Sequence, residues 1–216
     1  MVRNKCHLVI FDMDGTLLRG RTILKMGETK GRVSQIYQIL DSTEHAYVKT
    51  IKIAKCLRCM KTQEFLESFR AIPLQKNAEY VIKELQKKKI KTAIVTDSYT
   101  LGACDLKRRL GINYVFANKL ITEKGHITGG IILQNTQMTK RHPGCKQHSI
   151  CKGDIVLKLA RKLRITPKEI IAIGDSEVDI CMLKKAGLGI AFQAPETVRN
   201  KADIHTNDLT TVLDYI

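Results

Sequence analysis

Continuous apolar runs of strand length recur along the chain, separated by stretches in which apolar residues follow a helical period. Three runs, at 8–11 (LVIF), 91–97 (KTAIVTD) and 170–175 (IIAIGD), lack the polar/apolar alternation of a strand with one wet face. Such runs are typical of strands buried on both faces, as in a parallel sheet covered by helices. The remaining expected strands are a hairpin at 119–129 around Lys124-Gly125 and shorter strands near Tyr114, Gly189 and Asp203.

Helical periodicity predicts amphipathic segments between these strands. Over 33–40, four apolar residues recur at i, i+3, i+4 and i+7, which predicts a helix with one apolar face. Asp41 and Glu44 have capping-box spacing for a second helix that follows it. Further helices are expected at 62–70 (stopped before Pro73), at 76–88, at 101–110 (ended by Gly111) and from Asp208 onward.

The distance between the first two long runs is too large for a simple crossover. Asp12 and Lys91 are 79 residues apart, whereas a βαβ unit needs only about 30 residues. The surplus predicts a small helical cap at 18–74, inserted into a core made of 1–17 and 75–216. The predicted fold class is α/β: a Rossmann-like parallel sheet with helices on both faces and this inserted cap.

Two carboxylates close the first apolar run. Asp12 and Asp14 follow the strand, with Gly15 and Thr16 forming a turn behind them. Alternation along an extended strand would point the two acids to opposite faces, so we expect the glycine to let the chain curl and turn both toward one point. Two carboxylates about 4 Å apart repel by roughly 4 kcal/mol at an effective dielectric constant near 20, which implies a bound cation or a shared proton. An Asx-rich turn after a core strand is the alternative.

The other two long runs also end at polar side chains. Thr96 closes the second run and Asp175 the third, and Asp179 follows one helical turn later. Lys152 opens an amphipathic stretch between these two runs. Because ligands bind at the carboxyl ends of parallel strands, we expect these side chains to form one site. A solvated lysine at a helix start and a hydroxyl that satisfies a turn are the alternatives for Lys152 and Thr96.

Four motifs in this order resemble those of the haloacid dehalogenase-like hydrolase superfamily, and within it the phosphoserine phosphatase branch. They are Asp12-Met-Asp-Gly-Thr, Thr96, Lys152, and Gly174-Asp175-Ser-Glu-Val-Asp179. The similarity runs over nearly the whole chain and is specific as a set, although each motif alone is weak. It implies a phosphatase that hydrolyses a small-molecule phosphate monoester through an aspartyl-phosphate.

The resemblance also implies a role for each motif residue. Asp12 matches the nucleophile, and Asp14 the general acid that later activates water. Mg²⁺ would be held by Asp12, the backbone carbonyl of Asp14 and Asp175. Asp179 would support Lys152 or a metal-bound water. The groups expected to contact the phosphate are the Thr96 hydroxyl and the Lys152 ammonium.

Three departures from the family pattern concern the substrate. A glutamate nine residues after the nucleophile receives the ammonium of serine in the family, and here that position is Arg21. The family's Ser-Gly-Gly turn is Thr96-Asp97-Ser98, and its asparagine before the last aspartate is Val178. We therefore expect Arg21 and Asp97 to line a reshaped pocket in which phosphoserine is not the best substrate. The alternative is that another acid, such as Glu28 or Glu67, receives the ammonium.

Composition is that of an ordinary globular protein, at 216 residues with 44% hydrophobic and 27% charged residues. No apolar run approaches the ~20 residues needed to span a membrane, and no signal peptide precedes the first strand. Seven cysteines, an odd number scattered along the chain, indicate reduced thiols. We therefore expect a cytoplasmic protein with no membrane partner.

Charge supports an alternative of another class. The chain has 37 Lys and Arg against 21 Asp and Glu, a net charge of +16, as in nucleic-acid-binding proteins. A basic nucleic-acid-binding protein, or a polynucleotide-end phosphatase on the same fold, is therefore the alternative function. Against it, only 5% of residues are aromatic and Trp is absent, so bases would find few stacking partners. A solvated basic surface that attracts a small phosphate ester is the favoured explanation.

A second metal could bind in one polar loop. His142, Cys145, His148 and Cys151 lie within ten residues and are potential zinc ligands. Their spacing matches neither a Cys-x-x-Cys nor a His-x-x-x-His knuckle, so a polar loop with neighbouring thiols is the favoured interpretation.

Overall fold

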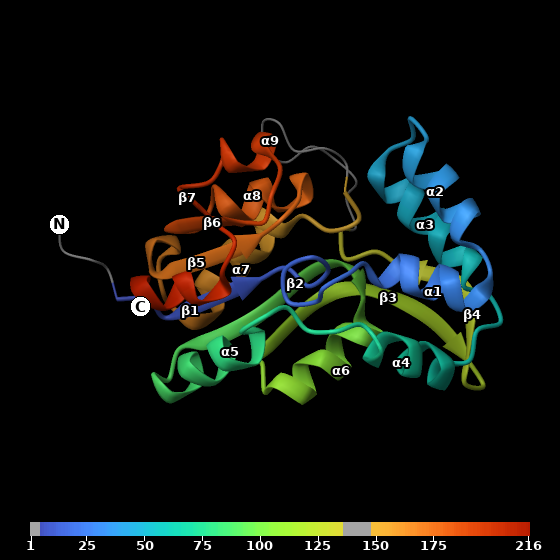
Figure 1. Ribbon diagram of the computed structural model, residues 1–216, viewed down its shortest axis with the longest axis horizontal. Coiled ribbons are helices and arrows are strands. Elements are labelled where there is room, and N and C mark those ends of the chain that lie inside the picture. The colour runs from blue at the N-terminus through green and yellow to red at the C-terminus, as the bar shows by residue number, and fades with distance from the viewer. Residues whose placement is uncertain (1–4, 136–147) are drawn as a thin grey trace.

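The computed structural model describes residues 5–135 and 148–216, and its centre is one seven-stranded sheet with the order β4-β3-β2-β1-β5-β6-β7 (Figure 1). All neighbouring strands are parallel except β3 and β4, which form an antiparallel hairpin turned by Lys124-Gly125. The predicted α/β class is confirmed. The strands are β1 (Leu8–Phe11), β2 (Lys91–Tyr99), β3 (Tyr114–Glu123), β4 (His126–Ile132), β5 (Ile170–Gly174), β6 (Leu188–Phe192) and β7 (Ile204–Thr206).

Alternate residues of β1 pack into two hydrophobic layers, one on each side of the sheet. Val9 and Phe11 join the larger cluster, with side chains from α5 (Ala78–Lys87) and α6 (Thr100–Leu110). Leu8 and Ile10 join the second cluster, with side chains from α7 (Lys152–Leu163) and α8 (Ile180–Leu183). Both sets are fully buried, which accounts for the unbroken apolar run. The other short helices are η1 (Pro167–Glu169), η2 (Glu177–Asp179), α9 (Glu196–Arg199) and η3 (Leu209–Tyr215).

The strand order reverses at β1, which determines where the site forms. β1 pairs with β2 on one side and with β5 on the other, and Phe11 is level with both Ile94 and Ile173. The residues that follow these positions therefore emerge at the same edge of the sheet. An open parallel sheet has its ligand crevice at such a reversal point.

Residues 18–74 contain four helices where the sequence predicts three. They are α1 (Thr22–Lys30), α2 (Val33–Asp41), α3 (Ala46–Cys56) and α4 (Thr62–Arg70). The helix α1 is the one missed by sequence reasoning, since it lacks a side-chain N-cap and an acidic first turn. The predicted capping box at Asp41 is wrong: Asp41 is the last residue of α2, and the extended residue before α3 is His45.

Two helices of residues 18–74 contact different parts of the core, α3 at β4 and α4 at α6. In Figure 1, α2 and α3 lie at the end of the sheet that carries β4, whereas α4 lies on the same side as α5 and α6. Gly102 on α6 lets the Phe69 ring of α4 approach closely, because a Cβ at residue 102 would lie 2.6 Å from that ring. The insertion thus ends in a helix that is packed on the core.

An ion pair between a buried carboxylate and an exposed arginine also joins α4 to α6. Asp105 has a side chain only 3% exposed, and it accepts hydrogen bonds from Arg70 Nη2 at 2.7 Å and from Arg108 Nη2 at 2.8 Å. The hydrogen bonds from Arg70 are the main cause that lowers the pKa of Asp105, and burial opposes them.

Asp105→Asn is expected to lower the free energy of unfolding at pH 7 by about 1–3 kcal/mol. The pKa of Asp105 is lower in the folded than in the unfolded chain, so its stabilisation is present above an unfolded pKa of about 3.9 and is lost as pH falls through the folded value. Urea unfolding between pH 3 and pH 7 measures this. The control is Glu79→Gln, which breaks an exposed pair with Lys83 and should cost less than about 0.5 kcal/mol. An equal loss for Asp105→Asn at every pH would contradict the assignment.

Candidate active site

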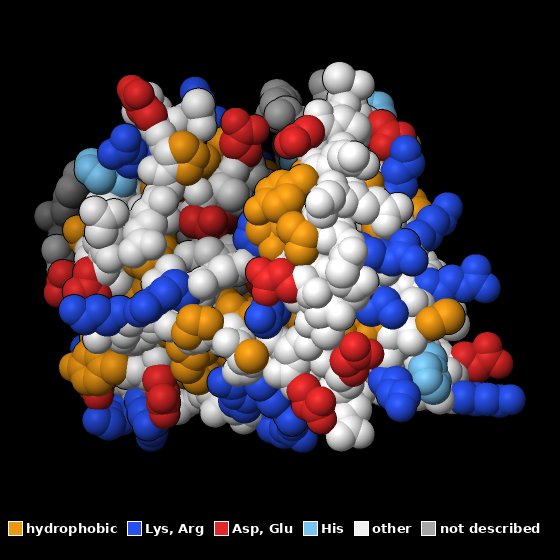
Figure 2. All heavy atoms as spheres, turned by 45° about the vertical axis from the view of Figure 1, so that its right-hand side comes forward, with side chains coloured by type: hydrophobic (Ala, Val, Ile, Leu, Met, Phe, Trp, Pro, Cys, Tyr) orange, Lys and Arg blue, Asp and Glu red, His pale blue; other side chains and the backbone are white. Residues whose placement is uncertain are grey.

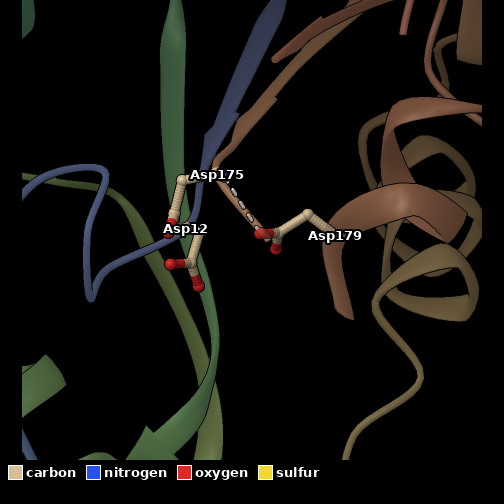
Figure 3. A group of neighbouring side chains, drawn as sticks. All are labelled: Asp12, Asp175 and Asp179. Atoms are coloured by element: carbon tan, nitrogen blue, oxygen red, sulfur yellow. Dashed lines mark hydrogen bonds between the residues drawn. The ribbon is translucent and has the colours of Figure 1, made fainter. Parts of the chain in front are cut away.

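Three aspartates converge at the carboxyl edge of the sheet. Asp12 follows β1, Asp175 follows β5, and Asp179 ends η2 (Figure 3). One carboxylate oxygen from each lies within 4.8 Å of the others, and the cluster is largely buried. The predicted proximity of these three side chains is confirmed. Adjacent parallel strands carry Asp12 and Asp175 to the same edge.

Lys152 connects two of these carboxylates. It is the first residue of α7 and is fully buried, and its Nζ donates to Asp12 Oδ1 at 2.5 Å and to Asp179 Oδ1 at 2.6 Å. Burial lowers the pKa of Lys152, but the two carboxylates raise it more, so the net pKa is raised. Lys152 therefore stays a cation, and the alternative of a solvated lysine is excluded.

Asp179 has both carboxylate oxygens engaged by protein donors. Besides the bond from Lys152 to Oδ1, its Oδ2 accepts from the backbone N–H groups of Asp175 and Ser176 at 3.1 and 3.0 Å and from the Ser176 hydroxyl at 3.0 Å. Gly174 is needed beside it, because a Cβ there would lie 2.4 Å from the Asp179 carboxyl carbon. These bonds fit a residue that holds Lys152 and the Asp175 turn in place better than a metal ligand.

Asp175 packs against the turn that follows the first strand. Its Oδ1 accepts a hydrogen bond from the Thr16 hydroxyl at 2.8 Å. Gly15 has a φ of +91°, and a Cβ there would lie 2.4 Å from Asp175 Oδ2, so both backbone conformation and space require glycine. Burial, followed by the neighbouring Asp179 charge, raises the pKa of Asp175 to about 6.

Asp14 lies apart from the carboxylate cluster. Its Oδ1 accepts a hydrogen bond from the hydroxyl of Thr22, the first residue of α1, at 2.5 Å. Burial raises the pKa of Asp14 to about 7, which the bond from Thr22 partly opposes. Burial likewise raises the pKa of Asp12, and Lys152 opposes that increase. A side chain with a pKa near neutrality can both donate and accept a proton at physiological pH.

A cavity of about 540 Å³ lies between this edge and the insertion. Arg21 and Asp97 line it as predicted, and so does Val178. The insertion also supplies polar Asp41 and Lys49 and an apolar set that the sequence did not indicate: Ile23, Leu40, Ala46 and Ile53. Glu28 and Glu67, the expected alternative acids, do not line the cavity; Glu28 pairs with Lys25 and Glu67 accepts from Gln63.

The last residues of β2 differ in their access to the cavity. Thr96 is fully buried, and its hydroxyl accepts the Ser98 backbone N–H at 3.1 Å, as the turn-satisfying alternative describes. Asp97, Ser98 and Tyr99 line the cavity. The Ser98 hydroxyl is buried and has no hydrogen-bond partner within 5–135 and 148–216. The phosphate contact predicted for Thr96 stays a prediction, and Ser98 is the hydroxyl at this edge that the sequence did not single out.

The donor set fits a hard divalent cation. Asp12 and Asp175 offer carboxylate oxygens, and such oxygens are the ligands that Mg²⁺ prefers. The three clustered aspartates and one lysine leave a net charge of −2 when all are ionised.

Of the proposed zinc ligands, His142 and Cys145 lie outside the described residues. No helix of the described chain is long and apolar enough to cross a membrane.

Residues 6–187 match the model of a hydrolase family, the haloacid dehalogenase-like hydrolases. The phosphoserine phosphatase of Methanocaldococcus jannaschii is 31% identical over 224 residues, covering 100% of both chains. That of Lactococcus lactis subsp. lactis is also 31% identical, covering 97% of this chain and 94% of its own.

Solved structures agree with these sequence matches. A substrate-bound phosphoserine phosphatase superimposes with a TM-score of 0.84 at 29% identity, covering 99% of each chain. A phospho-aspartyl intermediate analogue of phosphoserine phosphatase superimposes with a TM-score of 0.83 at 29% identity, covering 99% of this chain and 100% of that one.

Proposed function

The chain belongs to the haloacid dehalogenase-like hydrolases, and on that premise we propose that it hydrolyses small phosphate monoesters through a phosphoryl group carried on Asp12. The observation that carries the proposal is the fully buried Lys152, whose Nζ donates hydrogen bonds to Oδ1 of Asp12 and to Oδ1 of Asp179. A fixed cation at the nucleophile offsets the repulsion between a carboxylate and a phosphate dianion. The solved structure of a phospho-aspartyl analogue at 29% identity supports the same chemistry here.

The proposed reaction has two steps. Asp12 attacks phosphorus, the bond from phosphorus to the leaving oxygen breaks, and Asp14 gives that oxygen its proton. Asp14 then takes a proton from water, whose oxygen attacks the phosphoryl group and releases inorganic phosphate, restoring Asp12. Lys152 donates to Oδ1 of Asp12 and so fixes the orientation of the nucleophilic carboxylate.

Mg²⁺ is the proposed cofactor, and Asp12, Asp175 and the backbone carbonyl of Asp14 would hold it. When bound, it neutralises charge on the transferring phosphoryl group. Thr16 and Asp179 fix the two sides of Asp175, through its Oδ1 and its backbone N–H. Such outer contacts hold ligating carboxylates in position.

Residues 18–74 are proposed to act as the cap that closes the substrate cavity. The cavity walls come from both parts of the chain, with the reacting carboxylates on the core side and Arg21, Asp41 and Lys49 on the insertion. Its volume of about 540 Å³ suits a small molecule. On the face shown in Figure 2, Lys and Arg side chains are interspersed with Asp and Glu, so that face does not favour the polynucleotide alternative.

We propose further that the cavity recognises the leaving group differently from a phosphoserine site. Arg21 occupies the position expected to receive an ammonium, and it makes no ion pair within the described part of the chain. Lys49 adds a second cation, whose Nζ is held by the Leu40 carbonyl at 2.5 Å. Asp41 is the opposing charge on this wall. On the insertion side of the cavity Arg21 and Lys49 outnumber Asp41, whereas Asp97 and Glu177 line the core side. A leaving group bound against the insertion is therefore favoured when it is anionic over a zwitterion.

A panel of three esters tests this proposal, with kcat/KM for phosphate release as the readout. The esters are phosphoserine, 3-phosphooxypropanoate, which lacks only the ammonium, and phosphoethanolamine, which lacks only the carboxylate. The ester without the ammonium should be hydrolysed at least as well as phosphoserine, and the one without the carboxylate about tenfold less well, since a charge-assisted hydrogen bond contributes roughly 1.5 kcal/mol or more.

Variants of the two nearby arginines separate this effect from general charge. Arg21→Gln should lower kcat/KM for the two carboxylate esters and leave that for phosphoethanolamine within about threefold. Arg19→Gln changes an exposed arginine that does not line the cavity and should alter none of them. A tenfold preference for phosphoserine over both other esters would refute the altered recognition, and a 5′-phosphorylated oligonucleotide as the best substrate would favour the polynucleotide alternative.

A further inference from the structure

The proposed proton donor is held by the insertion and not by the core. The Thr22 hydroxyl donates to Asp14 Oδ1 at 2.5 Å, and the Thr22 backbone N–H also bonds to the Asp14 carboxylate. Thr22 is fully buried. Within the part of the chain that the structure describes, Asp14 makes no other side-chain hydrogen bond. Asp12, Asp175 and Asp179, by contrast, are all held by core residues.

Resting on the proposed function, we propose that Thr22 is a positioning residue that holds Asp14 in place for proton transfer to the leaving group. The hydroxyl engages Oδ1, which leaves Oδ2 of Asp14 to carry the proton. As that proton moves to the leaving oxygen, its bond to Asp14 breaks and the carboxyl becomes a carboxylate. The hydrogen bond from Thr22 then becomes charge-assisted and stronger, so it favours the transition state over the ground state.

The same contact links the proton donor to the substrate wall. Arg21 lines the cavity and directly precedes Thr22 in the chain. A leaving group that contacts Arg21 is therefore bound next to Thr22, whose hydroxyl orients Asp14. This adjacency makes residues 21–22 a single segment that meets both the leaving group and the acid.

A purely structural role for Thr22 has to be distinguished from this one. Arg21, the N-cap residue of α1, makes no side-chain cap bond, so the Asp14 carboxylate also serves as a cap for that helix. If Thr22 only stabilises the start of the helix, its loss should lower activity on every substrate to the same extent. A positioning role lowers kcat/KM, which reports the steps up to loss of the leaving group, only for esters whose leaving oxygen needs a proton.

The test compares two esters that differ in this need. Glycerol phosphate has an alkoxide leaving group that must be protonated, whereas p-nitrophenolate leaves without a proton. Thr22→Val removes the hydroxyl at nearly constant volume and keeps the backbone N–H. It should lower kcat/KM for glycerol phosphate about 10- to 100-fold and change that for p-nitrophenyl phosphate less than about threefold. Thr22→Ser keeps a hydroxyl and should restore activity on glycerol phosphate.

Thr29→Val is the matched control, since Thr29 is an exposed threonine on the same helix and contacts Lys25 and Ser68. It should leave kcat/KM unchanged for both esters. Equal losses on both esters for Thr22→Val, or no loss on either, would overturn the proposal. If Thr22→Val does not fold, Thr22→Ala replaces it; failure of both to fold while Thr22→Ser folds would assign Thr22 to the fold alone. Wild-type protein that releases no phosphate from either ester would instead refute the proposed function.

Discussion

Asp12→Asn is expected to reduce phosphate release by at least about 10⁴-fold, as loss of a covalent nucleophile does in other enzymes. The amide cannot attack phosphorus, but it occupies the same volume, and its oxygen can still accept the hydrogen bond from Lys152. The fold should therefore survive, and a melting temperature within a few degrees of the wild type would show this.

Trapping the phosphorylated enzyme makes this prediction specific to a covalent mechanism. Wild-type protein quenched in acid during turnover should gain the mass of one phosphoryl group on the peptide that contains residue 12, and Asp12→Asn should not. Asp14→Asn removes proton transfer only and should lose about 10²–10⁴-fold. Glu196→Gln, at an exposed position on α9, is the control and should match the wild type. Wild-type turnover by Asp12→Asn would exclude the aspartyl-phosphate.

Removing the metal is expected to reduce phosphate release about as much as Asp12→Asn does. EDTA should silence the wild-type protein, and Mg²⁺ should restore it. Ca²⁺ should inhibit, because its larger and looser coordination shell misplaces the nucleophile. Asp175→Ala should raise the Mg²⁺ concentration required for activity by at least about tenfold, since it removes one carboxylate from the cluster.

A binding readout distinguishes loss of metal from loss of chemistry. A ligand that binds only the folded state raises the melting temperature as its concentration increases. Mg²⁺ should therefore raise the melting temperature of the wild type more than that of Asp12→Asn. It should raise that of Asp175→Ala least. Asp208→Asn changes an acid that caps η3 far along the chain and should bind Mg²⁺ like the wild type. Full activity of the wild type in metal-free buffer would overturn the cofactor assignment.

The sheet, and the edge at which the aspartates gather, could be predicted because their signals are local. The run LVIF can bury all four side chains only between two helical layers, and the acids that close it must then emerge at the edge of the sheet. The positions of Asp12, Asp175 and Lys152 follow from the ends of three elements, so their convergence needed no knowledge of the loops.

The insertion was less predictable because its helices depend on distant partners. The helix α1 carries weak end signals, and what holds its first turn is the Asp14 carboxylate, eight residues earlier. Asp41 carries a capping signal, yet α2 continues through it. Local propensity is worth only a few tenths of a kcal/mol per residue, and such differences are overridden by packing between α2 and its neighbours.

The sequence by itself determined the α/β class, the order of the motifs and the residue types that the family resemblance expects at 12, 14, 152 and 175. Only the tertiary structure decided which groups share a cavity: that Asp14 bonds to Thr22, that Asp97 and Ser98 line the wall while Thr96 is buried, and that Asp41 and Lys49 face the same space as Arg21. The physical reason is that strand burial and turn chemistry are encoded by neighbours along the chain. The contents of a cavity between two packed parts depend on how side chains separated by tens of residues fill one volume.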